Sequence, residues 1–191
     1  MYDTGQGVVQ DSSEAAELYR LCAESGDGPA MLRLAQLYES GQGVSGDNAE
    51  AVTWYRKAAD ANQTQAQCRL AALYDSGDGV KQDSAEAVKW YKPCAESGVG
   101  PAMFRLAEIH AKGLTTPHDP SLAADYMLRA LKANVEQAKD EMLGGAKTWS
   151  QEFREEFQRK LQAENLYAGK IDGILGSGTK RAIDALTSDD S

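Results

Sequence analysis

Apolar residues recur along most of the chain at the three- and four-residue intervals of amphipathic helices. In the segment from Ala30 to Glu39, for example, Leu34 and Leu37 fall on the same helical face as Ala30. Arg33 lies on the opposite, polar face. No stretch shows the alternation of apolar and polar residues that is typical of a strand. The pattern therefore predicts an all-α protein.

The same pattern returns every 36 residues without a gap. A fixed period of this length predicts a solenoid, in which neighbouring units bury each other's apolar faces. The first unit is truncated, because Tyr2–Val8 matches Tyr38–Val44, the end of a first helix and its turn. We therefore expect a further segment upstream of Met1. Equivalent positions of the repeat include Ala30, Ala66 and Ala102, Leu34, Leu70 and Leu106, and Asp47, Asp83 and Asp119.

An aspartate precedes the second helix of each unit, the first of them at Asp11. In Asp47–Glu50 and Asp83–Glu86 a glutamate follows three residues later. This pairing predicts a capping box, in which the aspartate accepts from a free helical N–H and the glutamate bonds back to the aspartate amide. Asp119 is instead followed by Pro120, which suits a first helical position. We interpret these carboxylates as structural and not as acid–base catalysts.

A Gly-x-Gly-Val sequence separates the two helices of a unit, at Gly41 and Gly43 and again at Gly77 and Gly79. Loops that hold phosphate groups are also rich in glycine, but they follow a strand, and no strand is expected here. The first glycine of each pair follows a helix, where a left-handed residue commonly ends the helix. We therefore predict a helix C-cap at this glycine and no nucleotide site.

Arg33, Arg69 and Arg105 recur at one position on the polar face of the first helix in successive units. In stacked arrays this helix commonly lines the concave surface on which partners dock. Because the guanidinium group is suited to recognising carboxylates, we predict that these three arginines bind a partner protein.

The arginine column is also compatible with two roles that need no ligand. Each arginine could lie over apolar surface and pair with a nearby glutamate or aspartate. Duplication alone could also produce the column, because the segments Cys22–Ala35 and Cys94–Ala107 are identical at all but two positions. Shared ancestry would then account for the arginines without any partner.

The composition limits the classes of function. The formal net charge of −9 and the absence of Lys/Arg clusters argue against nucleic acid and anionic bilayers as partners. No run approaches the roughly 18–20 apolar residues of a membrane span, and the N-terminus lacks the pattern of a signal peptide. With two histidines and no Cys-x-x-Cys pair, we expect no metal site and no cofactor. No catalytic motif is present, so we predict that the chain is not an enzyme.

The three cysteines are predicted to be packing residues. Cys22 and Cys94 occupy one position of the repeat two units apart, which is too far for a disulfide, so we interpret them as small residues in a tight slot. Cys68 occupies the position of Leu32 and Phe104 and is expected to pack in the same way. On this interpretation, cysteine does not indicate a redox compartment.

The repeat resembles a known family. The sequence Ala-x-x-x-Leu-Ala-x-Leu-Tyr-x-x-Gly-x-Gly-Val from Ala30, continued by Trp54-Tyr55, is similar to the Sel1-like repeat, a relative of the tetratricopeptide repeat. The resemblance implies an α/α superhelix at residues 1–147 that acts as an adaptor without activity of its own. It also implies that Trp54 and Trp90 belong to the core between helices, and that His110 is a core substitution in an atypical last unit.

After Ala138 the period ends, and Gly144–Gly145 separates a different segment at residues 148–191. A helix is predicted from Gln151 to Glu164, with Thr148 and Ser150 as its start. Its apolar stripe is Phe153, Phe157 and Leu161. Asp172-Gly173 predicts a tight turn, and Ser177 or Thr179 is expected to cap a short final helix.

This segment is similar to the peptidoglycan-binding-like domain, a compact module of three helices. The resemblance implies that peptidoglycan is bound through Tyr167, Asp172 and Thr179. Several matched residues also have turn or cap roles that would persist without a ligand, so a purely structural module stays open as an alternative. The matching positions are Gln158, Leu161, Tyr167, Gly169, Ile171, Asp172, Gly173, Gly176 and Thr179.

Together these patterns lead to the hypothesis of a non-catalytic scaffold of the bacterial cell envelope. The repeats would hold a partner protein on their concave face, and the C-terminal module would contact peptidoglycan, which implies the periplasm. The alternative is the regulatory region of a larger enzyme, such as a caspase-like hydrolase, in which the last module only caps the solenoid.

Overall fold

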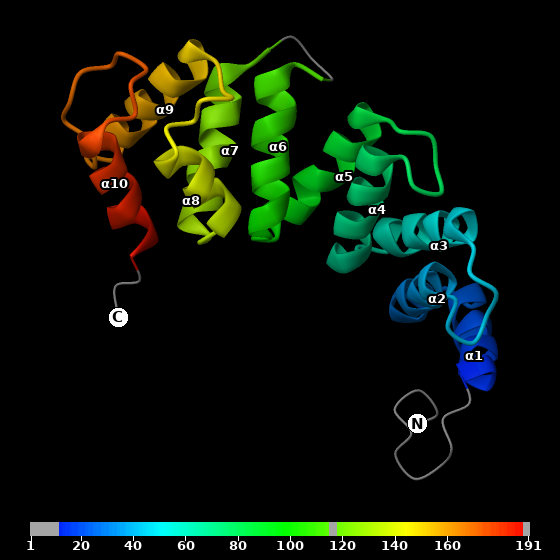
Figure 1. Ribbon diagram of the computed structural model, residues 1–191. Helices are drawn as coiled ribbons and strands as arrows, with labels where there is room; N and C mark the ends of the chain where they lie inside the picture. Colours follow the sequence, from blue (N-terminus) through cyan, green and yellow to red (C-terminus); the bar gives the residue numbers. More distant parts are fainter. Residues whose placement is uncertain (1–11, 115–117, 189–191) are drawn as a thin grey trace. The chain divides into compact units, whose positions relative to one another are not determined.

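The computed structural model describes residues 12–114 and 118–188, which form ten helices and no strand (Figure 1). The predicted all-α class is confirmed. The chain divides into two compact units, Met1–Cys94 and Ala95–Ser191. The expectations for Tyr2–Val8 and for the cap at Asp11 lie outside the described residues.

The first unit contains four complete helices and most of a fifth. Helix α2 packs on α1 and on α3, and α3 also packs on α4. The stripe expected from the periodicity is buried, since Leu34 and Leu70 are fully inaccessible and Trp54 is 8% exposed. The helices are α1 (Ser12–Glu24), α2 (Gly28–Ser40), α3 (Asn48–Asp60), α4 (Thr64–Ser76) and α5 (Ser84–Glu96), which ends in the second unit.

The predicted aspartate caps are confirmed, but the return bond of the capping box is wrong. Asp83 Oδ1 accepts from the backbone N–H groups of Ala85 and Glu86. The backbone N–H of Asp83 is not bonded to Glu86. It donates to the carbonyl of Tyr74 at the end of α4, at 2.9 Å. The Glu86 carboxylate instead accepts from the Trp90 indole. The hydrogen bond from Asp83 to the end of α4 therefore takes up the N–H group that a capping box would need.

The two glycines of each turn have different roles. Gly77 ends α4 with φ +80°, as predicted for a left-handed C-cap. Gly79 is required by a close approach, because a Cβ there would lie 2.4 Å from the backbone oxygen of Asn48. The turn after α4 therefore packs directly against the start of α3. Gly41 and Gly43 repeat both features, with Ser12 in place of Asn48.

The cysteine predictions are wrong in two respects, although Cys94 is buried as expected and does not bridge Cys22. Cys68 of α4 and Cys94 of α5 form a disulfide with a Cα–Cα distance of 5.3 Å. The two helices belong to one repeat and run antiparallel, so the start of α4 lies beside the end of α5. Cys22 is exposed instead of filling a tight slot. The repeat period relates Cys94 to its counterpart two units away, whereas its disulfide partner lies on the adjacent helix of its own repeat.

The second unit is organised around α7. This helix packs on α6 and on α9, and it also contacts α8 and α10. His110 is 4% exposed and stacks on Tyr126 with ring centroids 5.8 Å apart, which confirms its interpretation as a core substitution. The helices are α6 (Gly100–Lys112), α7 (Pro120–Lys132), α8 (Glu136–Leu143), α9 (Gln151–Ala163) and α10 (Ser177–Thr187).

The C-terminal segment begins as predicted but ends differently. Ser150 caps α9 by accepting from Phe153 N–H, and the predicted apolar stripe of α9 is fully buried. The expected side-chain cap of α10 is wrong, because Gly176 is its N-cap and Thr179 lies inside the first turn. Trp149 lies near Phe104 of α6, at 6.5 Å between ring centroids. The segment after residue 147 is therefore packed against the last repeat, and a domain boundary there stays a prediction.

Candidate functional site

Arg69 lies at the centre of a polar contact between two repeats of the first unit. Its Nε donates to Glu39 Oε1 of α2 at 2.6 Å, and a second guanidinium nitrogen forms an ion pair with the same oxygen. The other carboxylate oxygen accepts from the Tyr55 hydroxyl of α3 at 2.7 Å. The hydrogen bond to Glu39 raises the pKa of Arg69, and burial together with Glu39 raises the pKa of Tyr55. The cation is thus fixed in place by neighbouring helices.

A groove of about 370 Å³ opens beside this contact. The amide side chains of Gln36 and Gln65 line it together with Arg69, and Cys68 brings the disulfide to its wall. Charged and amide groups at a groove on helices α2 and α4 offer both donors and acceptors to a peptide backbone. Of the three arginines of the predicted column, Arg69 lines this groove, and we therefore take the groove as a candidate binding site.

The other two predicted arginines have local partners. Arg33 donates to Gln36 Oε1 of its own helix at 3.3 Å. Arg105 of the second unit forms an ion pair with Glu108, which also accepts from Lys112 at 3.3 Å. Pairing with a nearby carboxylate, one of the alternatives from the sequence, is therefore present for Arg69 and for Arg105. Arg33 and Arg69 share a unit, whereas Arg105 belongs to the other one.

The sequence did not reveal the contact of Tyr55 with Glu39. A signal was available, because Tyr91 and Asp75 occupy the same two positions of the next repeat and are hydrogen-bonded at 3.3 Å. A tyrosine and a carboxylate that recur together at a separation of 16 residues indicate a contact between neighbouring helices.

Gln158 organises the predicted peptidoglycan-binding segment. It is fully buried, and its Oε1 accepts from the backbone N–H groups of Asp172 (3.0 Å) and Gly173 (2.9 Å). Its Nε2 donates to the Ile174 carbonyl at 3.0 Å and lies 3.3 Å from Asp172 Oδ1. One side chain of α9 therefore holds the turn that precedes α10.

The three predicted peptidoglycan-binding residues take part in this local structure. The Tyr167 hydroxyl donates to the Lys170 carbonyl at 2.8 Å. Asp172 Oδ1 accepts from Ile174 N–H, and this bond, with a smaller contribution from Gln158, lowers the pKa of Asp172. Thr179 is 1% exposed, and its hydroxyl has no hydrogen-bond partner among the described residues. The structure thus turns Thr179 away from solvent and leaves Tyr167 at the surface.

A groove of about 400 Å³ lies beside Tyr167. Gly169 and Gly178 form part of its lining and keep it open, because neither has a side chain. The exposed Arg181 of α10 contributes the only charge to the lining. Of the three predicted peptidoglycan-binding residues, only Tyr167 borders this groove, and Arg181 was not among the predicted ones.

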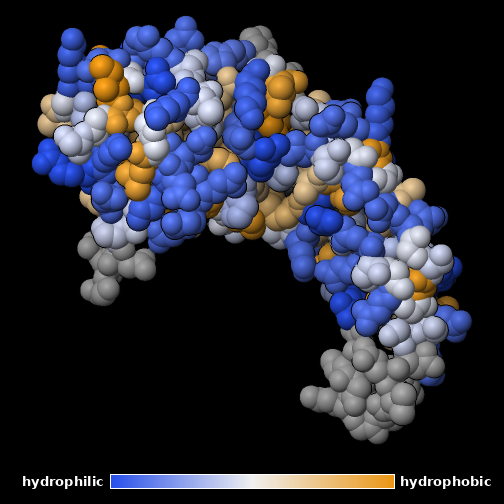
Figure 2. All heavy atoms as spheres, viewed as in Figure 1, coloured by the Kyte–Doolittle hydropathy of each residue, from blue (hydrophilic) through white to orange (hydrophobic). Residues whose placement is uncertain are grey.

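Within residues 12–114 and 118–188 no cluster of histidine, cysteine or acidic residues has the arrangement of a metal site. No helix in the same part of the chain is long and apolar enough to cross a membrane. Figure 2 shows that the face in view is mostly hydrophilic, with hydrophobic residues scattered over it.

Comparison with known proteins identifies the repeat. The Sel1 repeat model matches four segments, residues 1–27, 28–63, 64–99 and 100–135. The structure is similar to the crystal structure of a Sel1 repeat protein from Oxalobacter formigenes, with a TM-score of 0.72 and 24% identity over 96% of this chain and 82% of that one. No curated protein matched the chain.

A second solved structure is that of c5321, a protective antigen of uropathogenic Escherichia coli strains that displays an SLR fold. The TM-score is 0.70 with 26% identity. The match covers 97% of this chain but only 43% of c5321. These two likenesses confirm the predicted solenoid fold.

Proposed function

The chain belongs to the Sel1 repeat family, and on this premise we propose that it is a scaffold that holds a partner protein in the bacterial cell envelope. The observation that carries the proposal is the set of four matched repeats, which together make up most of the chain. Repeats of this kind generally act in protein interaction and not in catalysis. The groove at Arg69, with its fixed cation and its two amide side chains, is the proposed contact surface.

Site-specific photo-crosslinking tests this contact. A photoreactive residue at Gln65 lies on the groove, whereas one at Thr53 lies on the exposed side of α3 outside it. We expect a discrete adduct from Gln65 in cells that is weakened several-fold by Arg69→Gln. Equal adducts from both positions, or no adduct from Gln65, would reject the groove as the contact surface.

The disulfide supports an envelope location. Disulfides persist in oxidising compartments such as the bacterial periplasm and are rare in the cytosol. Cys68 and Cys94 are joined, while Cys22 is a free thiol. Acid quenching of cells, followed by alkylation of the denatured chain, checks this point, since one free thiol is expected per chain in the periplasm and three in a reducing compartment; denaturation is needed because Cys94 is buried.

Peptidoglycan contact through the C-terminal segment is the finer part of the proposal. The groove beside Tyr167 supports it, because Arg181 can pair with the carboxylates of the peptide stems and the tyrosine ring can pack on a sugar face. The matched residues Asp172 and Thr179 would act indirectly, by shaping the turn.

Co-sedimentation of the whole chain with insoluble purified peptidoglycan tests this part. We expect the chain to pellet, and Arg181→Gln to reduce the bound fraction several-fold. Lys180→Gln is the matched control, since it removes one exposed charge from the neighbouring position outside the groove. A chain that stays in the supernatant does not bind peptidoglycan, and its proposed function is then reduced to that of a protein scaffold.

A further inference from the structure

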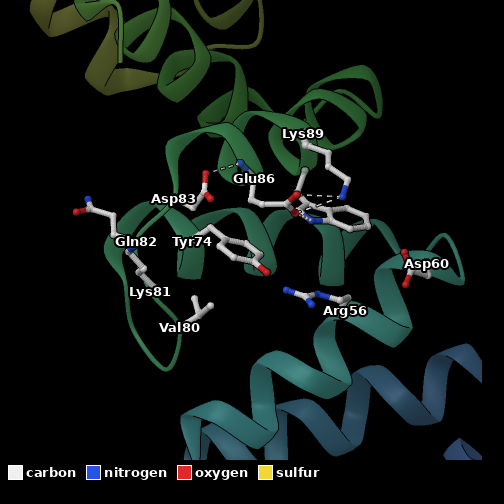
Figure 3. A pocket seen from close by; sticks show the side chains of 10 residues that line it. Arg56, Asp60, Tyr74, Val80, Lys81, Gln82, Asp83, Glu86 and Lys89 are labelled. Atoms are coloured by element: carbon white, nitrogen blue, oxygen red, sulfur yellow. Dashed lines mark hydrogen bonds and ion pairs between the residues drawn. The ribbon is translucent and has the colours of Figure 1, made fainter. Parts of the chain in front are cut away.

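A cavity in the first unit lies apart from the groove at Arg69. It has a volume of about 580 Å³, is open to solvent, and is lined by residues of α3, α4, the start of α5 and the turn between the last two (Figure 3). Arg56 enters it from α3, Tyr74 from α4 and Lys81 from the turn. Side chains from two successive repeats therefore face a common space.

Two cations of this cavity, Arg56 and Lys81, form no ion pair with a carboxylate in the described residues. The Arg56 guanidinium carbon lies 5.5 Å from the centroid of the Tyr74 ring. Apart from this ring contact, the side chains of Arg56 and Lys81 have no hydrogen bond or ion pair within the part of the chain that the structure describes. An arginine placed over an aromatic face keeps its nitrogen donors directed outward for a ligand.

Most of the carboxylates around the cavity are already engaged. Asp83 caps α5. Glu86 accepts from the Trp90 indole and from Lys89, each at 3.2 Å. Asp60 remains as the single carboxylate of the lining without a partner in the described residues. The formal charges of the lining balance, but Asp83 is bound to the N-terminus of α5 and Glu86 to Lys89, so Arg56 and Lys81 are the lining cations left without a carboxylate partner in the described residues.

The preceding junction between repeats shows what is particular to this cavity. There the residues equivalent to Arg56 and Tyr74 are Arg20 and Tyr38, and Arg20 donates to the Tyr38 hydroxyl. The residues equivalent to Lys81 and Lys89 are Ser45 and Thr53. Of these two junctions, only the second therefore adds two lysines to the shared framework.

We propose that this cavity binds the carboxylate of an aspartate or glutamate side chain in an extended segment of a partner protein. Arg56 would hold the carboxylate through two parallel N–H···O bonds, which match the planar geometry of both groups. Lys81 adds a second charge, and Val80 with Tyr74 forms an apolar wall for the neighbouring side chain of the peptide. The proposal is independent of the groove at Arg69, because no residue is shared between the two linings.

Titration of the whole chain by NMR tests the proposal. The probe is the N-acetylated, C-amidated peptide Gly-Leu-Glu-Leu-Gly, and its counterpart with glutamine in place of glutamate is the control. We expect saturable shifts of the Arg56 Nε–H and the Trp90 indole N–H with the first peptide only. Arg56→Gln should weaken binding about tenfold and Lys81→Gln several-fold, as expected for lost charge-assisted hydrogen bonds.

Arg20→Gln and Arg69→Gln are matched controls that remove a cation elsewhere in the unit, and both should leave affinity within about twofold. The proposal is overturned by equal binding of the glutamine peptide, by an equal effect of Arg20→Gln, or by no saturable shift at millimolar peptide. Equal shifts with inorganic phosphate would also overturn it, since they would indicate a general anion site. Lys81 is exposed, so its variant keeps the test valid should Arg56→Gln fail to fold.

Discussion

At the scale of single residues, Gln158 has the most demanding position in the C-terminal segment. Replacing it with alanine leaves the N–H groups of Asp172 and Gly173 without their acceptor. We expect Gln158→Ala to destabilise the second unit by about 2–3 kcal/mol, the cost of burying unsatisfied donors. Urea unfolding and hydrogen exchange at Gly173 measure this effect.

Gln162 provides the control for this variant. It lies one turn further along α9, is exposed, and donates a single bond to the Gly169 carbonyl. Gln162→Ala should therefore cost less than about 1 kcal/mol. Similar losses for the two variants would show that Gln158 contributes through helix propensity and not through the turn.

The carboxyl group of Asp172 should titrate at an unusually low pH. Its pKa is lowered below the ordinary value of 3.8 by bonds from Ile174 N–H and from Gln158. Because the folded pKa is the lower one, the ionised group stabilises the turn fully above the unfolded pKa. This contribution is lost as the pH falls through the folded pKa. The carbon-13 shift of the Asp172 carboxyl should titrate below 3.8, and Gln158→Ala should raise its midpoint; a midpoint at 3.8 or above contradicts the assignment.

At the scale of helices, the disulfide links the N-terminal half of α4 to the C-terminal end of α5. The bond closes a loop with a sequence separation of 26. Loop-closure entropy predicts a stabilisation of about 3.5 kcal/mol, so the double variant Cys68→Ser/Cys94→Ser should lose that amount in urea unfolding. Dithiothreitol should lower the stability of Cys22→Ser to the same level and leave the double variant unchanged. If dithiothreitol also lowered the stability of the double variant, its effect could not be attributed to reduction of this disulfide.

The turn between helices is also sensitive to a single methyl group. Gly79→Ala places Cβ 2.4 Å from the Asn48 carbonyl at φ +68°, so strain and overlap should together cost about 3 kcal/mol. Gly26→Ala is the control, because φ is +97° there but no atom lies within 4 Å. It should cost only about 1 kcal/mol. Thermal unfolding of both variants measures the difference, and equal losses would rule out the close approach.

At the scale of the whole molecule, the C-terminal segment is expected to support the last repeat. Helix α9 packs on α7, and ion pairs join Lys160 to Asp125 (2.7 Å) and Lys132 to Glu164 (2.8 Å). Removing residues 148–191 should therefore raise hydrogen exchange in α7 about tenfold or more and leave α2 to α4 unchanged. Hydrogen exchange with mass spectrometry distinguishes the outcomes. Unchanged protection in α7 would instead support an independent domain at 148–191.

The sequence by itself determined the helices, their order and most of their caps, the side-chain cap of α10 being the exception. The 36-residue period identified buried positions such as Leu34 and Leu70, and Asp83 predicted the start of α5. These features depend on residues within a turn or two of each other, so spacing along the chain is sufficient to predict them. The Gly77 cap was predicted for the same reason.

Only the tertiary structure decided which side chains meet across helices. Cys68 meets Cys94, Arg69 meets Glu39, and Gln158 reaches the turn before α10. Each contact joins residues far apart in the sequence, and their distance depends on how antiparallel helices are aligned. A repeat period fixes the equivalence of positions between units, but not the neighbours of a position within its own unit. For this reason the arginine column was visible in the sequence, while its partners and the cavity at Arg56 were not.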